Sequence, residues 1–340
     1  MAVTTLGKTL GKTLGKTLGK QAGPAADSTR NKPAIFIDGE AGTTGIEIRD
    51  RLARIESVDV RAIAPDKRKD PSARRALMAE VDLVILCLPD EAAKEAVALA
   101  DELGADAPRI LDASSAHRVC EGWTFGFPEM AAAQGDAIAR SRRVSNPGCY
   151  PTGGIALLRP LVEAKLMPPD YPVTVNAVSG YSGGGRSMIE AYESGTAPPF
   201  ELYGLGLEHK HVPELQKYSK LSRRPIFAPS IGNFRKGMLV SVPVHLDTLP
   251  GKPCAQDLEA VLATHYADAT WVKVIKADDP SARAGRLDAL ALNDTNLLEL
   301  RVFGNARHGH AVLVARLDNL GKGASGAAVQ NIGIMLGVET

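Results

Sequence analysis

The hydrophobic pattern divides the chain beyond residue 31 into two parts. Up to residue 148, short continuous apolar runs alternate with segments whose apolar residues recur at helical spacing. Continuous apolar strands separated by helices are typical of a parallel sheet that is covered on both faces. We therefore predict a parallel sheet with strands at 34–38, 58–64, 82–89 and 109–112 and helices at 46–53 and 91–103.

Beyond residue 148 the pattern changes to long strands of alternating polarity with few helices between them. After an apolar run at 155–158 that predicts a helix, we expect strands at 171–179, 238–245, 271–275, 297–303 and 310–317. Such strands are typical of a mixed or antiparallel sheet. A last helix at 327–336 is expected to pack back against the first part.

The first 31 residues carry a four-residue repeat, Leu-Gly-Lys-Thr, instead of a pattern that could form a core. A glycine in every unit disfavours a helix, and the segment cannot bury enough apolar surface to fold. We predict a disordered, low-complexity tail over 1–31. Its Gly-Lys-Thr triplets imitate the end of a phosphate-binding loop, but no strand precedes them.

A glycine-rich turn joins the first predicted strand to the first helix. Gly39, Gly42 and Gly45 have the spacing GxxGxxG, with Thr43 and Thr44 between them. Glycines let the backbone approach a pyrophosphate, and the helix N-terminus offers N–H donors and positive potential. The turn therefore predicts a dinucleotide site. Because the usual spacing is GxGxxG, a turn that merely links strand and helix is the alternative.

The end of the second predicted strand indicates which dinucleotide binds. In dinucleotide-binding folds this position faces the adenosine ribose, where an acidic residue favours NAD and cations accommodate the 2′-phosphate of NADP. Here Asp66 is followed by Lys67, Arg68 and Lys69. We predict NADP as the cofactor, with Arg68 as one of its contacts. A solvated run of charges is the alternative.

Together these features predict an α/β fold of two domains. The chain has 340 residues, more than one hydrophobic core usually spans. We predict a Rossmann-type parallel-sheet domain that binds NADP over 32–148 and 319–340. A catalytic and dimerisation domain of α+β type, with a mixed or antiparallel sheet, is predicted over 149–318. The sheet of this second domain is the expected interface between subunits.

The loop after the fourth predicted strand contains candidate phosphate contacts. Ligands gather at the carboxyl ends of the strands in a parallel sheet, so this loop is expected to line the site. Ser114, Ser115 and Arg118 have the side chains that hold phosphate oxygens, arginine through its two-pronged guanidinium. An ordinary surface loop is the alternative.

The residues around Cys149 point to a nucleophile. Pro147 and Gly148 before it and Pro151 after it place the cysteine in a rigid turn, just ahead of a predicted helix. Unpaired N–H groups and the helix dipole at such a position favour the thiolate, which is the nucleophilic form. A buried structural cysteine is the alternative, but those usually lie inside apolar runs, as Cys87 does.

A cysteine nucleophile needs an acid–base partner, and the histidines cluster in two places. His209 and His211 lie close together in one segment, whereas His308 and His310 flank a glycine at a strand entrance. Metal binding by the first pair is the alternative, but no third ligand follows at a usual spacing, so we expect no metal. Nucleotide fold, cysteine and histidine together indicate hydride transfer at an acyl carbon through a thioester.

Composition argues against several other classes of function. The chain has 40 lysines and arginines and 39 acidic residues, a net charge of +1, which gives no reason to expect nucleic acid or a membrane as partner. The apolar runs are shorter than the roughly 20 residues that a bilayer requires. Four cysteines without paired spacing are not a disulfide framework, which suits a cytoplasmic protein.

Several motifs follow one another in the order of a known family. The glycine turn is followed by the segments Ser114–Arg118, Ser145–Gly153, His209–Glu214 and Leu317–Gly326, and then by Gln330 and Asn331. In these motifs the chain resembles the N-acetyl-gamma-glutamyl-phosphate reductases of the semialdehyde dehydrogenase family, in particular their short form. The resemblance runs from about Pro33 to the C-terminus. The tail has no counterpart in the family pattern.

This resemblance implies a reaction. NADPH would reduce N-acetyl-glutamyl 5-phosphate to N-acetyl-glutamate 5-semialdehyde and phosphate, through a thioacyl intermediate on Cys149, in arginine biosynthesis. His209 matches the family's acid–base histidine, and His211 is the second candidate. The implied substrate contacts are Arg118, Glu214, Ser115, Asn146 and His211. The implied cofactor contacts are Gly39, Gly42, Thr43, Thr44, Gly45, Arg68, Ser114, Ser182, Gly183 and Gly184. We expect a homodimer or homotetramer.

Two other functions remain open at this point. An aspartate-semialdehyde dehydrogenase has the same fold and chemistry, but its substrate carries a free amino group that would need a carboxylate. Glu214 could serve either substrate. The second alternative is a catalytically silent protein that binds NADP as a regulator, against which the presence of both Cys149 and a histidine cluster argues.

Overall fold

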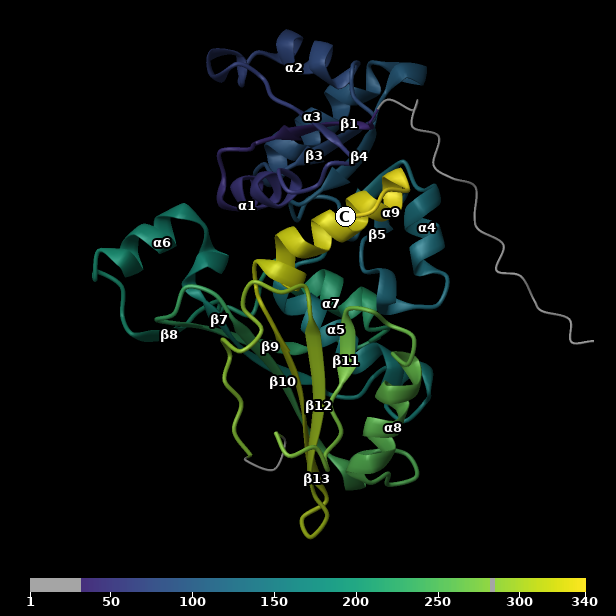
Figure 1. Cartoon of the computed structure of the whole chain (residues 1–340). Helices are drawn as coiled ribbons and strands as arrows, with labels where there is room; N and C mark the ends of the chain where they lie inside the picture. Colours follow the sequence, from purple (N-terminus) through teal and green to yellow (C-terminus); the bar gives the residue numbers. More distant parts are fainter. Residues whose placement is uncertain (1–31, 282–284) are drawn as a thin grey trace, which may run out of the picture. The chain divides into compact units, whose positions relative to one another are not determined.

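The structure is a computed structural model, and it describes residues 32–281 and 285–340. The segment predicted to be a disordered tail, 1–31, lies outside the described residues. A sheet of six strands and a sheet of seven strands form the framework of the described part (Figure 1).

The first sheet is parallel throughout, in the order β2-β1-β3-β4-β6-β5. Its strands are β1 (Ala34–Asp38), β2 (Asp59–Arg61), β3 (Leu83–Leu86), β4 (Arg109–Asp112), β5 (Thr124–Phe125) and β6 (Arg143–Ser145). The four strands that the sequence predicts are confirmed, although β2 and β3 are shorter than expected. The pattern does not predict β5 and β6, because two or three residues are too few to show a period.

Helices cover both faces of this sheet. Ile35 and Ile37 of β1 pack in one hydrophobic cluster with Ile332 near the C-terminus, whereas Phe36 packs in a separate cluster. The helices of the first cluster are α1 (Thr43–Leu52), α4 (Gln134–Arg140) and α9 (Gly326–Leu336), and those of the second are α2 (Pro71–Met78) and α3 (Asp90–Asp101). Because successive side chains of a strand point to opposite faces, burial on both sides explains the continuous apolar runs. The predicted return of the last helix to the first part is confirmed.

The glycine turn after β1 lets α1 begin at Thr43 instead of the predicted residue 46. Gly42 is the N-cap of this helix and is extended, with φ −76° and ψ 161°. Gly39 has a φ of +92°, and a Cβ there would lie 2.4 Å from the carbonyl oxygen of Cys87. A Cβ at Gly45 would lie 2.6 Å from the Gly39 oxygen. The helix can therefore start this close to the strand only where side chains are absent.

The second sheet is mixed, as the sequence predicts, in the order β11-β12-β13-β10-β7-β9-β8. The β7–β9 and β11–β12 pairs are parallel and the other pairs are antiparallel. Its strands are β7 (Thr174–Gly180), β8 (Phe200–Leu202), β9 (Ile226–Gly232), β10 (Met238–His245), β11 (Val272–Val274), β12 (Leu298–Asn305) and β13 (His310–Leu317).

The part of the chain that carries this sheet contains more helix than its sequence pattern predicts. Its helices are α5 (Cys149–Glu163), α6 (Arg186–Glu193), α7 (Val212–Tyr218) and α8 (Ala255–His265). α5 is the helix that the apolar run at 155–158 predicts, whereas α6 and α7 are too short to show a clear period. Single 3-10 turns lie at Pro65–Lys67, Gly104–Asp106, Pro128–Met130, Tyr181–Gly184 and Leu246–Thr248, and a π-helical turn at Gly321–Ser325 precedes α9.

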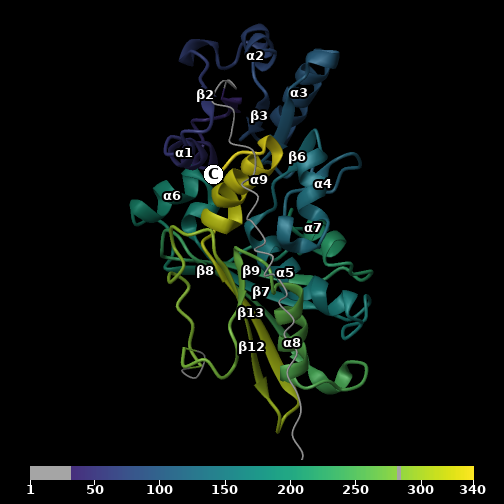
Figure 2. The same ribbon diagram turned by 45° about the vertical axis from the view of Figure 1, so that its right-hand side comes forward.

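One face of the second sheet is covered and the other is open. α5 and α8 share a hydrophobic cluster with the inward residues of β10, and alternate residues of that strand are more exposed. Figure 2 shows α8 beside β12 and β13. The open face carries apolar side chains that are more than half exposed, namely Phe200, Leu202 and Ile226. None of the helices in the described part of the chain has the length and apolar character that crossing a membrane requires.

We predict that the packing of α9 contributes strongly to the stability of the first sheet. Ile332 is fully buried, so Ile332→Ala should lower the free energy of unfolding by about 2–5 kcal/mol. Ile46→Ala is the matched control, because Ile46 is 39% exposed on α1 and its truncation should change stability little. Urea denaturation followed by circular dichroism measures both. Equal effects of the two variants would contradict the packing of α9.

Candidate active site

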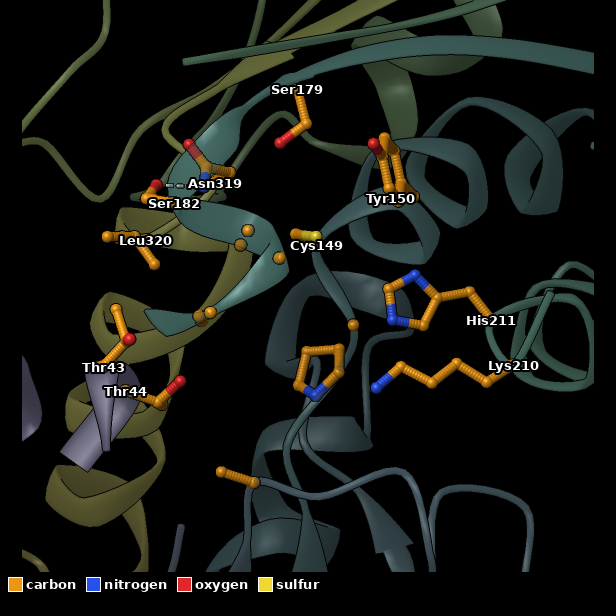
Figure 3. A pocket seen from close by; sticks show the side chains of 18 of the residues that line it. Thr43, Thr44, Cys149, Tyr150, Ser179, Ser182, Lys210, His211, Asn319 and Leu320 are labelled. Carbon is orange, nitrogen blue, oxygen red and sulfur yellow. Dashed lines mark hydrogen bonds between the residues drawn. The ribbon is translucent and has the colours of Figure 1, made fainter. Parts of the chain in front are cut away.

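A cavity of about 320 Å³ brings together segments that are far apart in the sequence (Figure 3). Among its lining residues are Thr43 and Thr44 at the start of α1, and Cys149 at the start of α5. The loop after β7 contributes Ser182–Gly185. Further lining residues come from the segments around His211 and Asn319.

Cys149 is the first residue of α5, and its position is set by close contacts on both sides. Gly148 is the N-cap, and its carbonyl accepts the N–H of Thr152 at 3.0 Å. The π-helical turn passes so near that a Cβ at Gly323 would lie 2.8 Å from the Cβ of Cys149. The sulfur is therefore held at the cavity wall at a helix N-terminus, as the sequence predicts.

The helix start is expected to favour the thiolate of Cys149, and burial acts against it in the structure. Burial raises the pKa of Cys149 to about 11, although the Arg118 charge and the N–H of Tyr150 act in the opposite direction. The helix start thus favours the thiolate, as expected, but desolvation is the larger effect. Burial therefore favours the thiol form of Cys149 at neutral pH.

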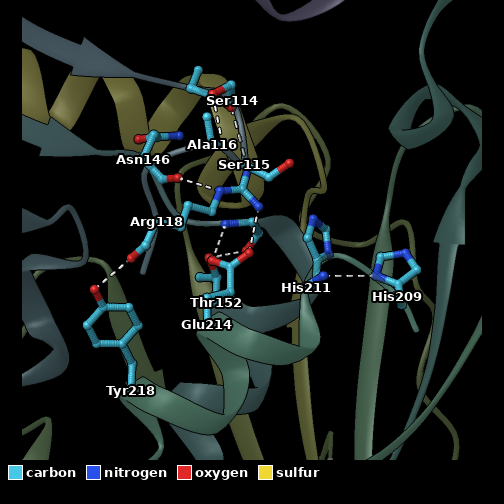
Figure 4. A network of polar contacts seen from close by, with 12 residues as sticks. Ser114, Ser115, Ala116, Arg118, Asn146, Thr152, His209, His211, Glu214 and Tyr218 are labelled. Carbon is cyan, nitrogen blue, oxygen red and sulfur yellow. Dashed lines mark hydrogen bonds and ion pairs between the residues drawn. The ribbon is translucent and has the colours of Figure 1, made fainter. Parts of the chain in front are cut away.

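A buried ion pair lies directly behind the cysteine turn (Figure 4). Arg118 donates from Nη1 to Oε1 of Glu214 at 2.6 Å, and the N–H of Gly148 donates to Oε2 of Glu214 at 3.0 Å. The side chain of Glu214 is 1% exposed. Both residues are predicted to contact substrate. Arg118 lines the cavity, but Glu214 does not, because its oxygens are engaged with Arg118 and the turn.

Asn146 lines the cavity and links the cysteine turn to α9. Its carbonyl oxygen accepts from Nε of Arg118 at 3.1 Å. Its side chain donates to the carbonyl of Ala324 at 3.0 Å and accepts from Asn331 at 3.1 Å. With its side-chain amide engaged in this way, Asn146 positions the turn.

The two serines predicted as phosphate contacts are directed elsewhere. Ser114 donates to Asp112 at 2.8 Å, and Ser115 bonds Asp90 at the start of α3 through both its hydroxyl and its N–H. Neither residue lines the cavity, although their neighbour Ala113 does. The hydrogen bonds of the two serines hold the turn that follows β4.

His209 and His211 lie together at the cavity, with ring centroids 4.8 Å apart. A Cβ at Gly148 would lie 2.8 Å from Nε2 of His211, so this ring is next to the cysteine turn. Nδ1 of His209 accepts the backbone N–H of His211 at 3.1 Å. Desolvation, followed by nearby cations, lowers the pKa of His209 to about 4 and holds the pKa of His211 well below its usual value. Both rings are neutral at pH 7.

The candidate cofactor residues fall into three groups. Thr43, Thr44, Ser182, Gly183 and Gly184 line the cavity. The remaining residues of the glycine turn, Gly39, Gly42 and Gly45, shape the start of α1 and are not among the lining residues. Arg68 lies away from the cavity, paired with Glu40.

Several lining residues have no role in the sequence predictions. Lys210 stands between the two histidines, and Tyr150, Ser179 and Asn319 face the cavity from three elements. Asn319 donates to the hydroxyl of Ser182 at 2.9 Å and accepts the N–H of Gly237 at 2.9 Å. It lies in the closing motif of the sequence, which could have pointed to it. Among the described residues, no group of three or more histidine, cysteine or acidic side chains is arranged to hold a metal ion.

Comparisons with known proteins identify the family of the chain. The family model for the semialdehyde dehydrogenase dimerisation domain matches residues 149–319. N-acetyl-gamma-glutamyl-phosphate reductase 2 of Nostoc sp. is 50% identical over 318 residues, which cover 91% of this chain and 98% of that protein. N-acetyl-gamma-glutamyl-phosphate reductase of Chelativorans sp. is 51% identical over 305 residues, which cover 89% and 97%.

Solved structures with the same fold are more distant in sequence. Aspartate semialdehyde dehydrogenase II of Vibrio cholerae superposes with a TM-score of 0.67 at 16% identity, covering 90% of this chain and 98% of that one. Aspartate semialdehyde dehydrogenase of Candida albicans, determined with NADP, has a TM-score of 0.60 at 13% identity, covering 89% and 98%. These likenesses establish the fold, and the two reductases show to which group within the semialdehyde dehydrogenase family the chain belongs. The chain is an oxidoreductase that belongs to the N-acetyl-gamma-glutamyl-phosphate reductases of the semialdehyde dehydrogenase family.

Proposed function

We propose that this enzyme reduces N-acetyl-glutamyl 5-phosphate to N-acetyl-glutamate 5-semialdehyde and phosphate, with NADPH, in arginine biosynthesis. The observation that carries the proposal is Cys149 at a helix start, in a cavity that also contains His211 and Arg118. The names of the 50% identical relatives supply the substrate class.

The residues at the start of α1 fit a bound dinucleotide. The first-turn N–H groups of Thr43, Thr44 and Gly45 have no acceptor among the described residues, so they can hold phosphate oxygens. Ser182, Gly183 and Gly184 would lie along the nicotinamide half, and Arg68 would hold the 2′-phosphate of NADP by sharing its guanidinium with Glu40. When bound, NADPH supplies the hydride that reduces the thioester.

In the proposed mechanism Cys149 attacks the acyl carbon, and the carbon–oxygen bond to phosphate breaks. Since Cys149 rests as a thiol, its proton moves to a base during attack. The developing oxyanion is stabilised by the N–H groups at the start of α5. Pro151 has no N–H and the Gly148 N–H is bound to Glu214, so Cys149 and Tyr150 supply these donors.

We propose His211 as the acid–base residue, in place of His209. The Nε2 of His211 borders Gly148, and its Nδ1 is buried without a hydrogen-bond partner among the described residues. Nδ1 of His209 is already engaged by the N–H of His211, which suits a positioning role. A neutral His211 can take the proton from the thiol. It passes that proton to the leaving phosphate, and a proton from solvent restores the thiol when the aldehyde leaves.

The charges around the cavity favour an acetylated substrate over one with a free amine. None of the lining residues is an aspartate or a glutamate, and Glu214 is occupied behind the turn. A substrate ammonium group would therefore be desolvated without a carboxylate partner, which is costly. This supports N-acetyl-glutamyl phosphate against an aspartyl substrate. A silent NADP-binding regulator would need neither the cysteine nor the histidine that this cavity contains.

We further infer that the enzyme assembles as a homodimer or homotetramer through the open face of the second sheet. The face carries Phe200, Leu202 and Ile226 as exposed apolar side chains. The matched family model is named as a dimerisation domain and covers these strands. Four free cysteines in the described part of the chain fit a reducing compartment, so we infer that the enzyme works in the cytoplasm.

The substrate can be tested by running the reaction in reverse. With NADP and phosphate, N-acetyl-glutamate semialdehyde should be oxidised and aspartate semialdehyde should not, because the cavity has no carboxylate for the amine. Absorbance of NADPH measures turnover. Cys149→Ser should abolish it while leaving NADP binding intact. Turnover of the aspartyl compound would move the assignment to the neighbouring enzyme, and NADP binding without any turnover would favour the regulator.

The choice of acid–base residue predicts unequal effects of two matched variants. His211→Asn should lower kcat by about 10²–10⁴-fold, because the proton of the thiol then has no acceptor. His209→Asn should have a clearly smaller effect, since that ring only supports the backbone of His211. Steady-state kinetics measures both variants, and the reverse order would restore His209 as the acid–base residue.

The raised pKa of Cys149 predicts how the free enzyme is alkylated. Only the thiolate reacts with iodoacetamide, so the rate at Cys149 should rise about tenfold per pH unit between about pH 7 and pH 10, without a plateau. Mass spectrometry identifies the modified residue, and Cys149→Ser corrects for the other cysteines. A rate that is already constant near neutral pH would show that Cys149 rests as a thiolate.

A further inference from the structure

Lys210 enters the cavity from the segment that joins β8 to α7. It stands between the two histidines, and Figure 3 shows its side chain extending below the His211 ring toward the middle of the cavity. The residue is exposed, so the ammonium group is accessible to a ligand. The buried ring of His211 and the first residues of α7 set where this segment turns.

Lys210 has no charge partner among the described residues. No carboxylate of that part of the chain lies within salt-bridge distance of Lys210, whereas Lys236 and Lys322 are paired with glutamates. Arg118, the other permanent cation of the cavity, is already paired with Glu214 at 2.6 Å. Of these two cations, Lys210 is therefore the one that has no carboxylate partner among the described residues and can pair with an anionic ligand in the cavity.

The field of Lys210 reaches the reacting groups. Its charge contributes to lowering the pKa of His209 and of His211, and it acts in the same direction on the pKa of Glu214. No acidic residue lines the cavity, so the nearest carboxylate that offsets this positive field is that of Glu214, behind the turn. An anion placed beside Lys210 would be attracted by the cavity as a whole.

We propose that Lys210 is a substrate-positioning residue that binds an anionic oxygen group of the substrate. The inference rests on the proposed function, because it takes the substrate to be an N-acylated acidic amino acid activated as an acyl phosphate. That molecule offers two such groups, the phosphoryl group at the reacting carbon and the α-carboxylate at the other end. Lys210 acts as a point charge with three donors, which suits either oxyanion.

The reverse reaction separates these two groups, since inorganic phosphate and the semialdehyde then bind as different substrates. Lys210→Met keeps most of the side-chain volume and removes the charge. It should raise one KM by about tenfold to a hundredfold, the effect of losing one charge-assisted hydrogen bond, with a much smaller change in kcat. A rise in the KM of phosphate assigns Lys210 to the phosphoryl group, and a rise in the KM of the aldehyde assigns it to the carboxylate.

Two control variants sharpen the test. Lys210→Arg keeps the charge and should recover most of the lost affinity. Lys94→Met removes one positive charge from the exposed surface of α3, where Lys94 pairs with Glu91, and should leave both KM values unchanged. If Lys210→Met leaves both KM values within about twofold of wild type, the inference is wrong, even though wild-type turnover would uphold the proposed function.

A binding measurement keeps the inference testable if the wild-type enzyme does not turn over the acetylated aldehyde. Isothermal titration calorimetry can follow inorganic phosphate and N-acetyl-glutamate, which carry the two anionic groups, on the NADP-loaded enzyme. Weaker binding of either ligand to Lys210→Met than to wild type and Lys94→Met supports Lys210 as the anion contact. Unchanged binding of both overturns it.

Discussion

The site depends on one buried carboxylate. Glu214 accepts the Gly148 N–H with one oxygen and the Arg118 guanidinium with the other, so it joins α7, the cysteine turn and the loop after β4. Removing one partner of such a buried pair costs about 3–5 kcal/mol, because the remaining charge is left unpaired. Glu214 also lies on the helix that begins just after His211. The carboxylate therefore holds together the segments that carry Cys149, His211 and Arg118.

The same burial that holds these groups in place controls their charge. Desolvation opposes the thiolate of Cys149 and the protonated form of His211, so burial favours a neutral thiol and a neutral imidazole in the same cavity. This pair is less reactive toward stray electrophiles than a thiolate–imidazolium pair would be. In the proposed mechanism the proton is transferred only when an acyl phosphate reaches the cavity and the N–H groups at the start of α5 stabilise the product of attack.

Close backbone approach explains the glycines of two motifs that lie far apart in the sequence. A side chain at Gly148 would collide with Arg118, Glu214 and His211, and one at Gly323 would collide with Cys149. The closing motif thus belongs to the cavity, because its π-helical turn forms part of the wall next to Cys149. Asn319 connects the same motif to Ser182 and so joins the loop after β7 to that wall.

The sequence by itself determined the features that depend on neighbouring residues. The periods of the apolar runs predict most strands and the mixed character of the second sheet, and Pro147, Gly148 and Pro151 locate the cysteine turn. Only the tertiary structure shows that Glu214, Ser114 and Ser115 bond other groups of the chain, that His211 borders Gly148, and that burial raises the pKa of Cys149. It also revealed Lys210 as a cation that lacks a carboxylate partner among the described residues. Apart from the local bond between Ser114 and Asp112, these properties depend on desolvation and on contacts between segments that are far apart in the sequence. Glu214 bonds Arg118 and Gly148, and Gly323 lies against Cys149, and such contacts leave no local pattern.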